Sequence, residues 1–377
     1  MIVPADRTQL FSEYYFSRKL REIHQLQAAG RSIINLGIGS PDLAPAEAVV
    51  AKLASTASNA DVHGYQSYQG LPEFRQSIKD FYSNRYQATV QNLEVLPLMG
   101  SKEGITHVSM AFLNPGDQVL IPDLGYPTYT SVTRMVGATA IYYPLQEDSW
   151  EPDWSKLEEL DTSKVKMMWL NYPHMPTGAR GSLNLLKKLV DYAREREVLL
   201  CHDNPYSFIG NEHPYSIFNV EGAGDVAVEL SSLSKTFNMA GWRVGWIVGD
   251  QQFLQPVLQI KSNMDSGMFR PVQEAAITAL KLDNSWYEQL TKTYTTRRQL
   301  GEQIFDQLGC EYQSDQVGMF IWAKAPGNGE AFIEEILNKH DVFLAPGFIF
   351  GAMGVNYVRM SLCADESVLK EVLNRIK

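Results

Sequence analysis

The stretch SLSKTFNMAGWRVGW, residues 232–246, contains one lysine, Lys235, among small and apolar neighbours. The apolar segment DVAVEL (225–230) precedes it, and a second apolar segment, RVGWIVGD (243–250), overlaps its end. Both segments have the length and composition of buried strands. A lysine at the end of a buried strand indicates a chemical role, because lysines on a solvated face are normally spread among other charges.

The alternation of apolar and amphipathic segments continues on the N-terminal side of this stretch. The strand-like segments are LEVLPLMG (93–100), DQVLIPD (117–123), VKMMWLNYP (165–173) and VLLCHDNPY (198–206). Helical patterns lie between them, among them SKEGITHVSMAFL (101–113) and LNLLKKLVDYAREREV (183–198). This order predicts an α/β fold with a mostly parallel sheet between helices, and ligands of such sheets bind at the carboxyl ends of the strands.

The C-terminal part of the sequence has a different pattern. From about Met264 it is rich in helical segments, and it ends in a few strands and a terminal helix. The helical pattern near the N-terminus, residues 10–30, is expected to pack on this part. We therefore expect a large α/β domain over residues 36–264 and a smaller α+β domain built from residues 1–35 and 265–377.

The composition excludes several classes of protein. The 377 residues carry a formal net charge of −10, so we expect no basic surface for nucleic acid or for an anionic membrane. No apolar segment reaches transmembrane length, and the N-terminus lacks the order of a secretory signal. Cys201, Cys310 and Cys363 lie far apart, which favours free thiols and a cytoplasmic location.

The motifs of several other enzyme classes are incomplete or absent. Ser232 and Lys235 form an S-x-x-K pair, but serine acylases also need S-D-N and K-T-G elements, and the sequence has neither. It also lacks a G-x-S-x-G nucleophile elbow, a P-loop, and H-E-x-x-H or C-x-x-C metal pairs. We therefore expect no metal site.

A candidate phosphate site lies at the start of a predicted helix. Gly100, Ser101 and Lys102 follow a strand and open the helix, where backbone amides and a hydroxyl can bind an anion. Taken alone, this pattern fits an ordinary serine N-cap equally well. Arg243 can pair with a phosphate in a bidentate manner, or it can form a surface ion pair.

A candidate acid lies at the end of another predicted strand. Asp203 ends the apolar run VLLCHD, where a carboxylate is costly unless it meets a positive partner. It can also be a turn residue before Asn204 and Pro205. Tyr206 follows three residues later and can present its phenol to the same ligand.

Together these residues match the needs of one cofactor, pyridoxal phosphate. A lysine forms an imine with its aldehyde, and an acid keeps its pyridine nitrogen protonated so that the ring withdraws electrons. A helix start and an arginine bind its phosphate. The order along the chain is phosphate site, aspartate, lysine and arginine, which suits this interpretation.

Longer motifs make the similarity specific. The segments HGYQSYQGLPEFR, MGSKEGI, NPGDQVLIPDLGYPTY, PTGA, HDNPY, SLSKTFNMAGWRVGW and YVRMSLC occur in this order. Over nearly its whole length the chain thereby resembles the class I/II aminotransferases of fold type I, the aspartate aminotransferase superfamily. GSKEGI and GYPTY are similar to the branch that contains the bacterial LL-diaminopimelate aminotransferases.

The resemblance implies a role for each matching position. Lys235 is expected to form the internal aldimine and to move the proton between the substrate Cα and C4′ of the cofactor. Asp203 is expected to face the pyridine nitrogen, Tyr206 to face O3′, and Tyr126 to lie over the ring. The residues expected around the phosphate are Gly100, Ser101, Lys102 through its amide, Ser232, Ser234 and Arg243.

The resemblance also implies how substrate and a second subunit take part. Arg359 is expected to bind the α-carboxylate of the substrate, with the backbone near Gly39 and with Asn171 close to it. Tyr65 is expected to reach the phosphate of the neighbouring subunit, which implies a homodimer whose active sites are shared. The preferred side chain is not readable, although Tyr14, Tyr15, Phe16, Tyr65 and Tyr68 are candidates for lining its pocket.

One position departs from the family pattern. The family usually has N-P-T-G, and its asparagine donates a hydrogen bond to O3′, whereas NYPHMPTGAR places Met175 at that cofactor-contacting position. A thioether donates no hydrogen bond. Tyr206 is then the only matched donor to O3′, unless His174 or Asn171 substitutes.

We therefore expect a homodimeric aminotransferase that depends on pyridoxal phosphate. An amino acid gives its nitrogen to the cofactor and leaves as a 2-oxo acid, and an acceptor such as 2-oxoglutarate takes the nitrogen back. A C–S β-lyase on the same fold is the alternative, because reaction class follows the placement of side chains around one shared cofactor. A regulator that senses the cofactor would need an added DNA-binding domain, for which the sequence offers no support.

Overall fold

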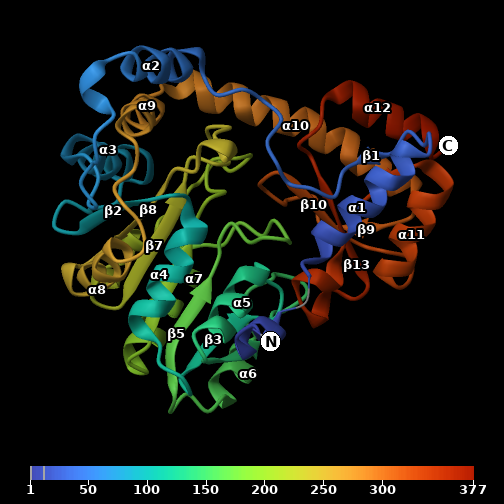
Figure 1. The fold of residues 1–377 in the computed structure, drawn as a ribbon. Helices are drawn as coiled ribbons and strands as arrows, with labels where there is room; N and C mark the ends of the chain where they lie inside the picture. Colours follow the sequence, from blue (N-terminus) through green and yellow to red (C-terminus); the bar gives the residue numbers. More distant parts are fainter. Residues whose placement is uncertain (1, 12) are drawn as a thin grey trace.

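The computed structural model describes residues 2–11 and 13–377, and its largest element is a seven-stranded sheet (Figure 1). The strand order is β2-β8-β7-β6-β5-β3-β4. Only β8 runs antiparallel to its neighbours β2 and β7, while the other pairs are parallel. The bounds are β2 Glu94–Leu98, β3 Gln118–Pro122, β4 Thr139–Tyr143, β5 Val165–Leu170, β6 Leu199–Asp203, β7 Ala227–Ser232 and β8 Gly245–Gly249. The predicted α/β fold with a mostly parallel sheet is confirmed.

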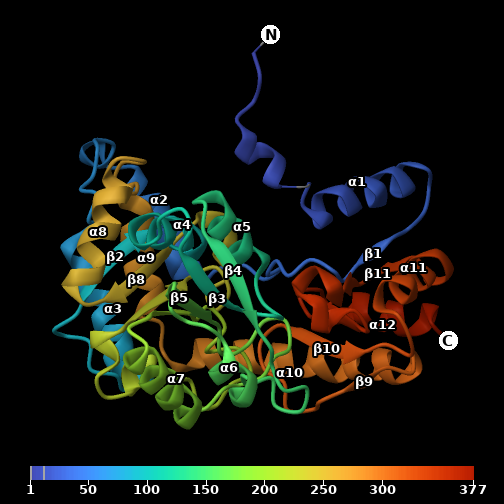
Figure 2. The ribbon, with the colours of Figure 1, turned by 90° about the horizontal axis from the view of Figure 1, so that it is seen from below.

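Helices cover both faces of this sheet, because successive side chains of each strand point to opposite faces. Met167 and Trp169 of β5 belong to an apolar cluster with α4, α5 and α8, while Met168 and Leu170 belong to a second cluster with α3 and α7. Figure 2 shows α4 and α5 above the sheet and α7 below it. The bounds are α2 Glu47–Ala57, α3 Pro72–Phe81, α4 Ser101–Phe112, α5 Pro127–Met135, α6 Trp154–Glu159, α7 Leu183–Glu195, α8 Gln251–Ser262 and α9 Arg270–Leu280.

A second, smaller unit contains an antiparallel sheet in the order β12-β13-β10-β9. N-terminal residues join it: β1 pairs in parallel with β11, and Lys19 of α1 forms a salt bridge with Glu334 of α11. Figure 1 shows the N-terminal α1 beside the C-terminal elements. The bounds are α1 Tyr15–Ala28, β1 Ile34–Asn35, β9 Glu311–Tyr312, β10 Phe320–Lys324, α11 Gly329–His340, β11 Val342–Phe343, β12 Ala345–Pro346, β13 Tyr357–Ser361 and α12 Glu366–Arg375.

The long helix α10 (Asn284–Gln307) runs between the two units. Helix α9, which the predicted division at residue 264 assigns to the smaller domain, packs on α2 and α3 beside the large sheet. A boundary drawn from packing alone therefore falls near the start of α10. The division into residues 36–264 and residues 1–35 with 265–377 stays a prediction.

The remaining elements are short helical turns. They are η1 Asp6–Leu10, η2 Ala60–Val62, η3 Tyr82–Tyr86, η4 Ile217–Asn219, η5 Ala223–Asp225, η6 Ala240–Trp242, η7 Gly347–Phe350 and η8 Ala352–Gly354. The N-terminal helix is shorter than the helical pattern predicted for residues 10–30, because α1 covers residues 15–28. Within residues 2–11 and 13–377, no helix combines the length and the apolar character needed to cross a bilayer.

Candidate active site

A cavity of about 360 Å³ lies at the carboxyl ends of the parallel strands, where the large sheet meets the smaller unit. Most of the residues predicted for the site line it: Gly39, Ser101, Lys102, Tyr126, Asn171, Met175, Asp203, Tyr206, Ser232, Ser234, Lys235, Arg243 and Arg359. Gly100 lies directly beside it as the N-cap of α4. Tyr65 alone lies elsewhere, with 95% of its surface exposed.

Lys235 follows the end of β7 and points its amine into the cavity. Its Nζ donates a hydrogen bond to the Gly39 carbonyl at 2.7 Å, and it lies 6.0 Å from the centre of the Tyr206 ring. Burial lowers the pKa of Lys235 to about 8, and the positive charges of Arg359 and Arg243 act in the same direction. A substantial fraction of the amine is therefore uncharged and nucleophilic at mildly alkaline pH.

Asp203 ends β6 as a buried carboxyl group with one free oxygen. Its Oδ2 accepts a hydrogen bond from the Tyr129 hydroxyl at 2.9 Å, whereas Oδ1 has no partner among the described residues. Burial raises the pKa of Asp203 to about 6, although the hydrogen bond from Tyr129 opposes the rise. A buried acceptor without a partner is costly, so the site is arranged for a donor that approaches from the cavity.

The start of α4 and the side chain of Arg243 lie in close contact beside the cavity. Arg243 donates to the Ala240 carbonyl at 2.8 Å and to the Met99 carbonyl at 3.3 Å. A Cβ at Gly100 would lie 2.1 Å from Arg243 Nη2, so only glycine permits this approach of the guanidinium. The free amides at the helix start and the guanidinium together supply the positive field that a phosphate needs.

Arg359 of β13 is a buried cation between two aromatic rings. Its guanidinium lies 4.0 Å from the centre of the Phe320 ring and 4.7 Å from that of Phe350. It donates to the Gly37 carbonyl at 2.9 Å and contacts Met175 Sδ at 3.6 Å. Burial lowers the pKa of Arg359 to about 10, so it stays charged near neutrality. No carboxylate of the described residues forms a salt bridge with it, which leaves it ready for an anionic ligand.

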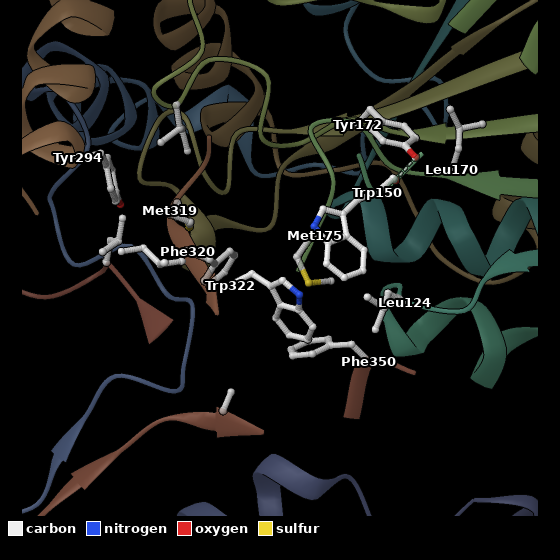
Figure 3. Packing of buried hydrophobic residues seen from close by; sticks show 14 of the residues in the cluster. Leu124, Trp150, Leu170, Tyr172, Met175, Tyr294, Met319, Phe320, Trp322 and Phe350 are labelled. Carbon is white, nitrogen blue, oxygen red and sulfur yellow. Dashed lines mark hydrogen bonds between the residues drawn. The ribbon is translucent and has the colours of Figure 1, made fainter. Parts of the chain in front are cut away.

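Met175 lines the cavity, and both residues considered as substitutes for its missing donor are already engaged. Figure 3 shows Met175 in one apolar cluster with Trp322 and Phe350. The ring of His174 contacts the Thr177 hydroxyl at 2.8 Å and the Leu124 carbonyl at 3.1 Å, and burial lowers the pKa of His174 to about 4.

Asn171 uses its amide within the protein. Its Nδ2 donates to the Asp203 carbonyl, and its Oδ1 accepts the Met175 backbone N–H at 2.7 Å. His174 therefore has no spare donor in this arrangement, whereas the Asn171 amide keeps a second N–H beside the cavity. Tyr206, the residue expected to face O3′, also lines the cavity.

Sequence reasoning missed several residues of the cavity. Tyr129 bonds to Asp203, and its spacing of three residues from Tyr126 at the start of α5 is a signal that was available. Phe320 and Phe350 had no such signal, because they come from separate apolar segments. The remaining unpredicted lining residues are Ile38, Pro205 and Ala240. Of the aromatic residues named for a side-chain pocket, Tyr14 and Phe16 line the cavity, whereas Tyr15, Tyr65 and Tyr68 do not.

Comparisons with known proteins agree with this geometry. The family model for aminotransferase class I and II matches residues 31–376. The LL-diaminopimelate aminotransferases of Halothermothrix orenii and Aquifex aeolicus are 36% and 37% identical to this chain, over 99% of it and over 97% and 98% of their own lengths. The substrate-bound structure of BacF from Bacillus subtilis is 33% identical, with a TM-score of 0.93 over 100% of this chain and 97% of that one. The similarity thus spans the large sheet, the smaller unit and the cavity between them.

Proposed function

This chain belongs to the class I and II aminotransferase family and is an aminotransferase, and we propose that its reaction depends on pyridoxal phosphate bound in the cavity with Lys235 as the reactive amine. One observation carries the proposal. A lysine with a lowered pKa, a buried carboxyl with a free oxygen and an unpaired buried arginine face a single cavity.

The residues present fit this cofactor at both of its ends. The unpartnered Oδ1 of Asp203 is suited to accept a hydrogen bond from a protonated ring nitrogen. The approach of Arg243 to Gly100 leaves a positive pocket beside Ser101 for a phosphate. Bound there, pyridoxal phosphate supplies an aldehyde for amines and a ring that withdraws electrons.

The chain's own residues divide the remaining work. We assign the phosphate to Ser101, the Lys102 amide, Ser232, Ser234 and Arg243. Tyr126 is assigned to the ring face and Tyr206 to the ring hydroxyl. Lys235 lines the same cavity, so a cofactor held by these residues would have the amine of Lys235 within the cavity to react with.

Lys235 and Arg359 act on the substrate in this proposal. Arg359 binds the α-carboxylate, because guanidinium suits a carboxylate geometrically and this one has no internal salt bridge. Lys235 would accept a proton from the substrate Cα and return it to C4′ of the cofactor, for which a pKa of about 8 is well placed. The Gly39 carbonyl holds the amine in the meantime.

The donor amino acid is the finer part of the proposal. LL-diaminopimelate is the first candidate, because the relatives named for it are 36% and 37% identical over nearly the whole chain. The cavity wall formed by Tyr14, Phe16 and Ile38 suits an apolar or aromatic side chain instead. A panel of donors that includes both kinds distinguishes them.

A C–S β-lyase is the alternative, and relatives named as aminotransferases favour amino-group transfer over it. A lyase releases its oxo acid without an acceptor, whereas a transferase turns over only when an acceptor is present. The test is therefore to give the cofactor-loaded protein each amino acid with and without 2-oxoglutarate. Catalytic turnover that needs the acceptor is expected, and acceptor-independent turnover on cysteine conjugates would contradict the proposal.

The assembly and location remain proposals as well. We propose a homodimer in which Tyr65 serves the phosphate of the partner's site, because this tyrosine is almost fully exposed and does not line its own cavity. Cys201, Cys310 and Cys363 are free thiols, which supports a reducing compartment such as the cytoplasm.

A further inference from the structure

Met99, the residue before Gly100, is held by hydrogen bonds at both of its backbone polar groups. The Met99 N–H donates to the carboxylate of Glu103, and the Met99 carbonyl accepts a hydrogen bond from Arg243 Nη2 at 3.3 Å. Gly100 is the next residue and has φ of 84°, in the left-handed region that favours glycine. One side chain of α4 thus reaches back to the residue from which the phosphate pocket begins.

Glu103 is fixed from behind by a buried group of polar side chains. Its Oε1 accepts from His107 Nε2 at 3.0 Å and from Lys261 Nζ at 3.2 Å, and Lys261 also donates to Asp265 at 2.6 Å. The side chain of Lys261 is only 3% exposed. These contacts join α4 to α8, two helices on the same face of the large sheet.

The ionic state of this group follows from its contacts. Burial alone would raise the pKa of Glu103, but hydrogen bonds from His107 and Asp265, the charge of Lys261 and the hydrogen bond from Met99 outweigh it and hold that pKa well below its usual range. The pKa of Asp265 is raised by burial and by the neighbouring Glu103. Glu103 is therefore a carboxylate at all ordinary pH values.

Two simpler interpretations of Glu103 explain less. Glu103, His107 and Asp265 lie within metal-ligating distance of one another, but the ammonium of Lys261 lies among them and already supplies the positive charge. An ordinary capping bond to a helix end would affect stability alone. Neither interpretation accounts for a hydrogen bond to the N–H of the residue whose carbonyl also holds Arg243.

Close packing leaves little room for the turn at Gly100 and Ser101 to move. A Cβ at Gly245 of β8 would lie 2.8 Å from the Gly100 carbonyl carbon and 2.8 Å from the Ser101 nitrogen. The turn is thus pressed against β8 on one side and against Arg243 on the other. A change in the backbone dihedral angles of Met99 would change the direction of the amides that follow and would release one hydrogen bond of Arg243.

We propose that Glu103 is a positioning residue for the cofactor phosphate: by holding the Met99 N–H, it sets the direction of the Gly100 and Ser101 amides and of Arg243. The inference rests on the proposed function, because it takes the phosphate of pyridoxal phosphate as the anion. Lys261 has a supporting part, since it neutralises a carboxylate that would otherwise repel the phosphate.

The test compares two cofactors that differ only in the phosphate. Binding of pyridoxal phosphate and of pyridoxal to the cofactor-free protein is measured by absorbance and tryptophan fluorescence, for wild type, Glu103→Ala and Glu103→Gln. The Glu103→Ala variant is expected to lose about tenfold in affinity for pyridoxal phosphate and to keep its affinity for pyridoxal. Glu103→Gln retains one acceptor for the Met99 N–H, so its affinity for pyridoxal phosphate should lie between those of wild type and Glu103→Ala.

Asp250→Ala is the matched control, because Asp250 caps α8 by accepting the Gln252 N–H at 2.9 Å and lies outside the pocket. It should lower thermal stability and leave the ratio of the two affinities unchanged. If Glu103→Ala weakens both ligands equally, or neither, the positioning role is wrong. If wild type itself does not prefer pyridoxal phosphate to pyridoxal, the proposed function fails first. Should Glu103→Ala not fold, the ratio measured for Glu103→Gln decides alone.

Discussion

At the scale of single residues, Met175 is the clearest departure from the family pattern. It contacts Arg359 through sulfur and presents no donor, and the side chains of His174 and Asn171 are committed to other partners. The second N–H of Asn171 has no such commitment. We propose that hydrogen bonding to the cofactor's ring oxygen nevertheless comes from Tyr206 alone. We therefore expect the bound cofactor to have a higher pKa than in relatives that have asparagine at the position of Met175.

Met175→Asn tests this expectation. The ring oxygen is most negative when the bound cofactor is deprotonated, so an added donor favours that form and lowers its pKa. A hydrogen bond to a charged acceptor contributes about 1.5–3 kcal/mol, and one pKa unit corresponds to about 1.4 kcal/mol. Allowing for imperfect geometry, the visible absorbance band should titrate about one unit lower in the variant. Superimposable titration curves would mean that the oxygen already has a second donor.

Lys235 gives a second prediction at this scale, for the cofactor-free protein. Its folded pKa of about 8 lies below the ordinary value of 10.5, so the folded state binds fewer protons than the unfolded state between these values. Below pH 8 the destabilising effect of the buried charge is fully present. The free energy of unfolding then rises as the pH increases from 8 toward 10.5. The shift corresponds to about 3 kcal/mol at most.

Lys235→Met removes this charge at similar volume. We expect a gain in the free energy of unfolding on the order of 1–2 kcal/mol at pH 7, because the lost hydrogen bond to Gly39 offsets part of the effect. The gain should shrink toward pH 10. Urea unfolding at both pH values measures it. A variant less stable than wild type at pH 7 would show that the buried charge of Lys235 does not destabilise the folded protein.

At the scale of elements, the phosphate pocket depends on the contact between β8 and the start of α4. Gly245→Ala would place its Cβ 2.8 Å from backbone atoms of both Gly100 and Ser101, which cannot move as a flexible side chain can. A loss of about 1–3 kcal/mol in stability is expected. Binding of pyridoxal phosphate should weaken at the same time.

Gly241→Ala is the control for this prediction. It lies in the nearby turn η6, and no described atom comes within 4 Å of a Cβ placed there. It should leave stability and cofactor binding almost unchanged. Equal effects of Gly241→Ala and Gly245→Ala in thermal melts and cofactor titrations would contradict the claim that close packing shapes the pocket.

The elements also show which features a sequence can reveal. Asp203 could be predicted because an acid at the end of an apolar strand needs a partner, and Gly100 and Ser101 because they join a strand to a helix. Phe320 and Phe350 could not be predicted, because they meet Arg359 only after separate segments of the smaller unit fold together. No local pattern indicates such a contact.

The packing of α9 is a similar case. It lies in the helix-rich C-terminal part of the sequence, yet it packs on α2 and α3 beside the large sheet. Amphipathic periodicity predicts that a helix buries one face but not which partner covers it. The contacts of Glu103 with Lys261 and Asp265 could not be predicted for the same reason, because these two residues come from the region of α8.

At the scale of the whole molecule, Tyr65 tests the proposed dimer. It is 95% exposed and does not line its own cavity, and the adjacent Gln66 is fixed by an isolated bridge with Gly267. If Tyr65 serves the other subunit, Lys235→Ala and Tyr65→Ala chains should complement each other when they are refolded together. The mixed dimer then contains one site with neither substitution.

The control is to refold each variant alone, which should restore little activity. Recovery in the mixture and not in the separate samples supports the shared site. A monomer in sedimentation, or a mixture no more active than the two variants alone, would contradict it.

The most direct test of the central claim is the identity of the lysine that bonds to the cofactor. The protein loaded with pyridoxal phosphate is reduced with borohydride, digested, and its peptides are analysed by mass spectrometry. We predict that the cofactor mass is found on Lys235 and that the buried Lys261 and the cavity-lining Lys102 remain unlabelled. A protein without visible absorbance after loading, or a label on any lysine other than Lys235, would contradict the account.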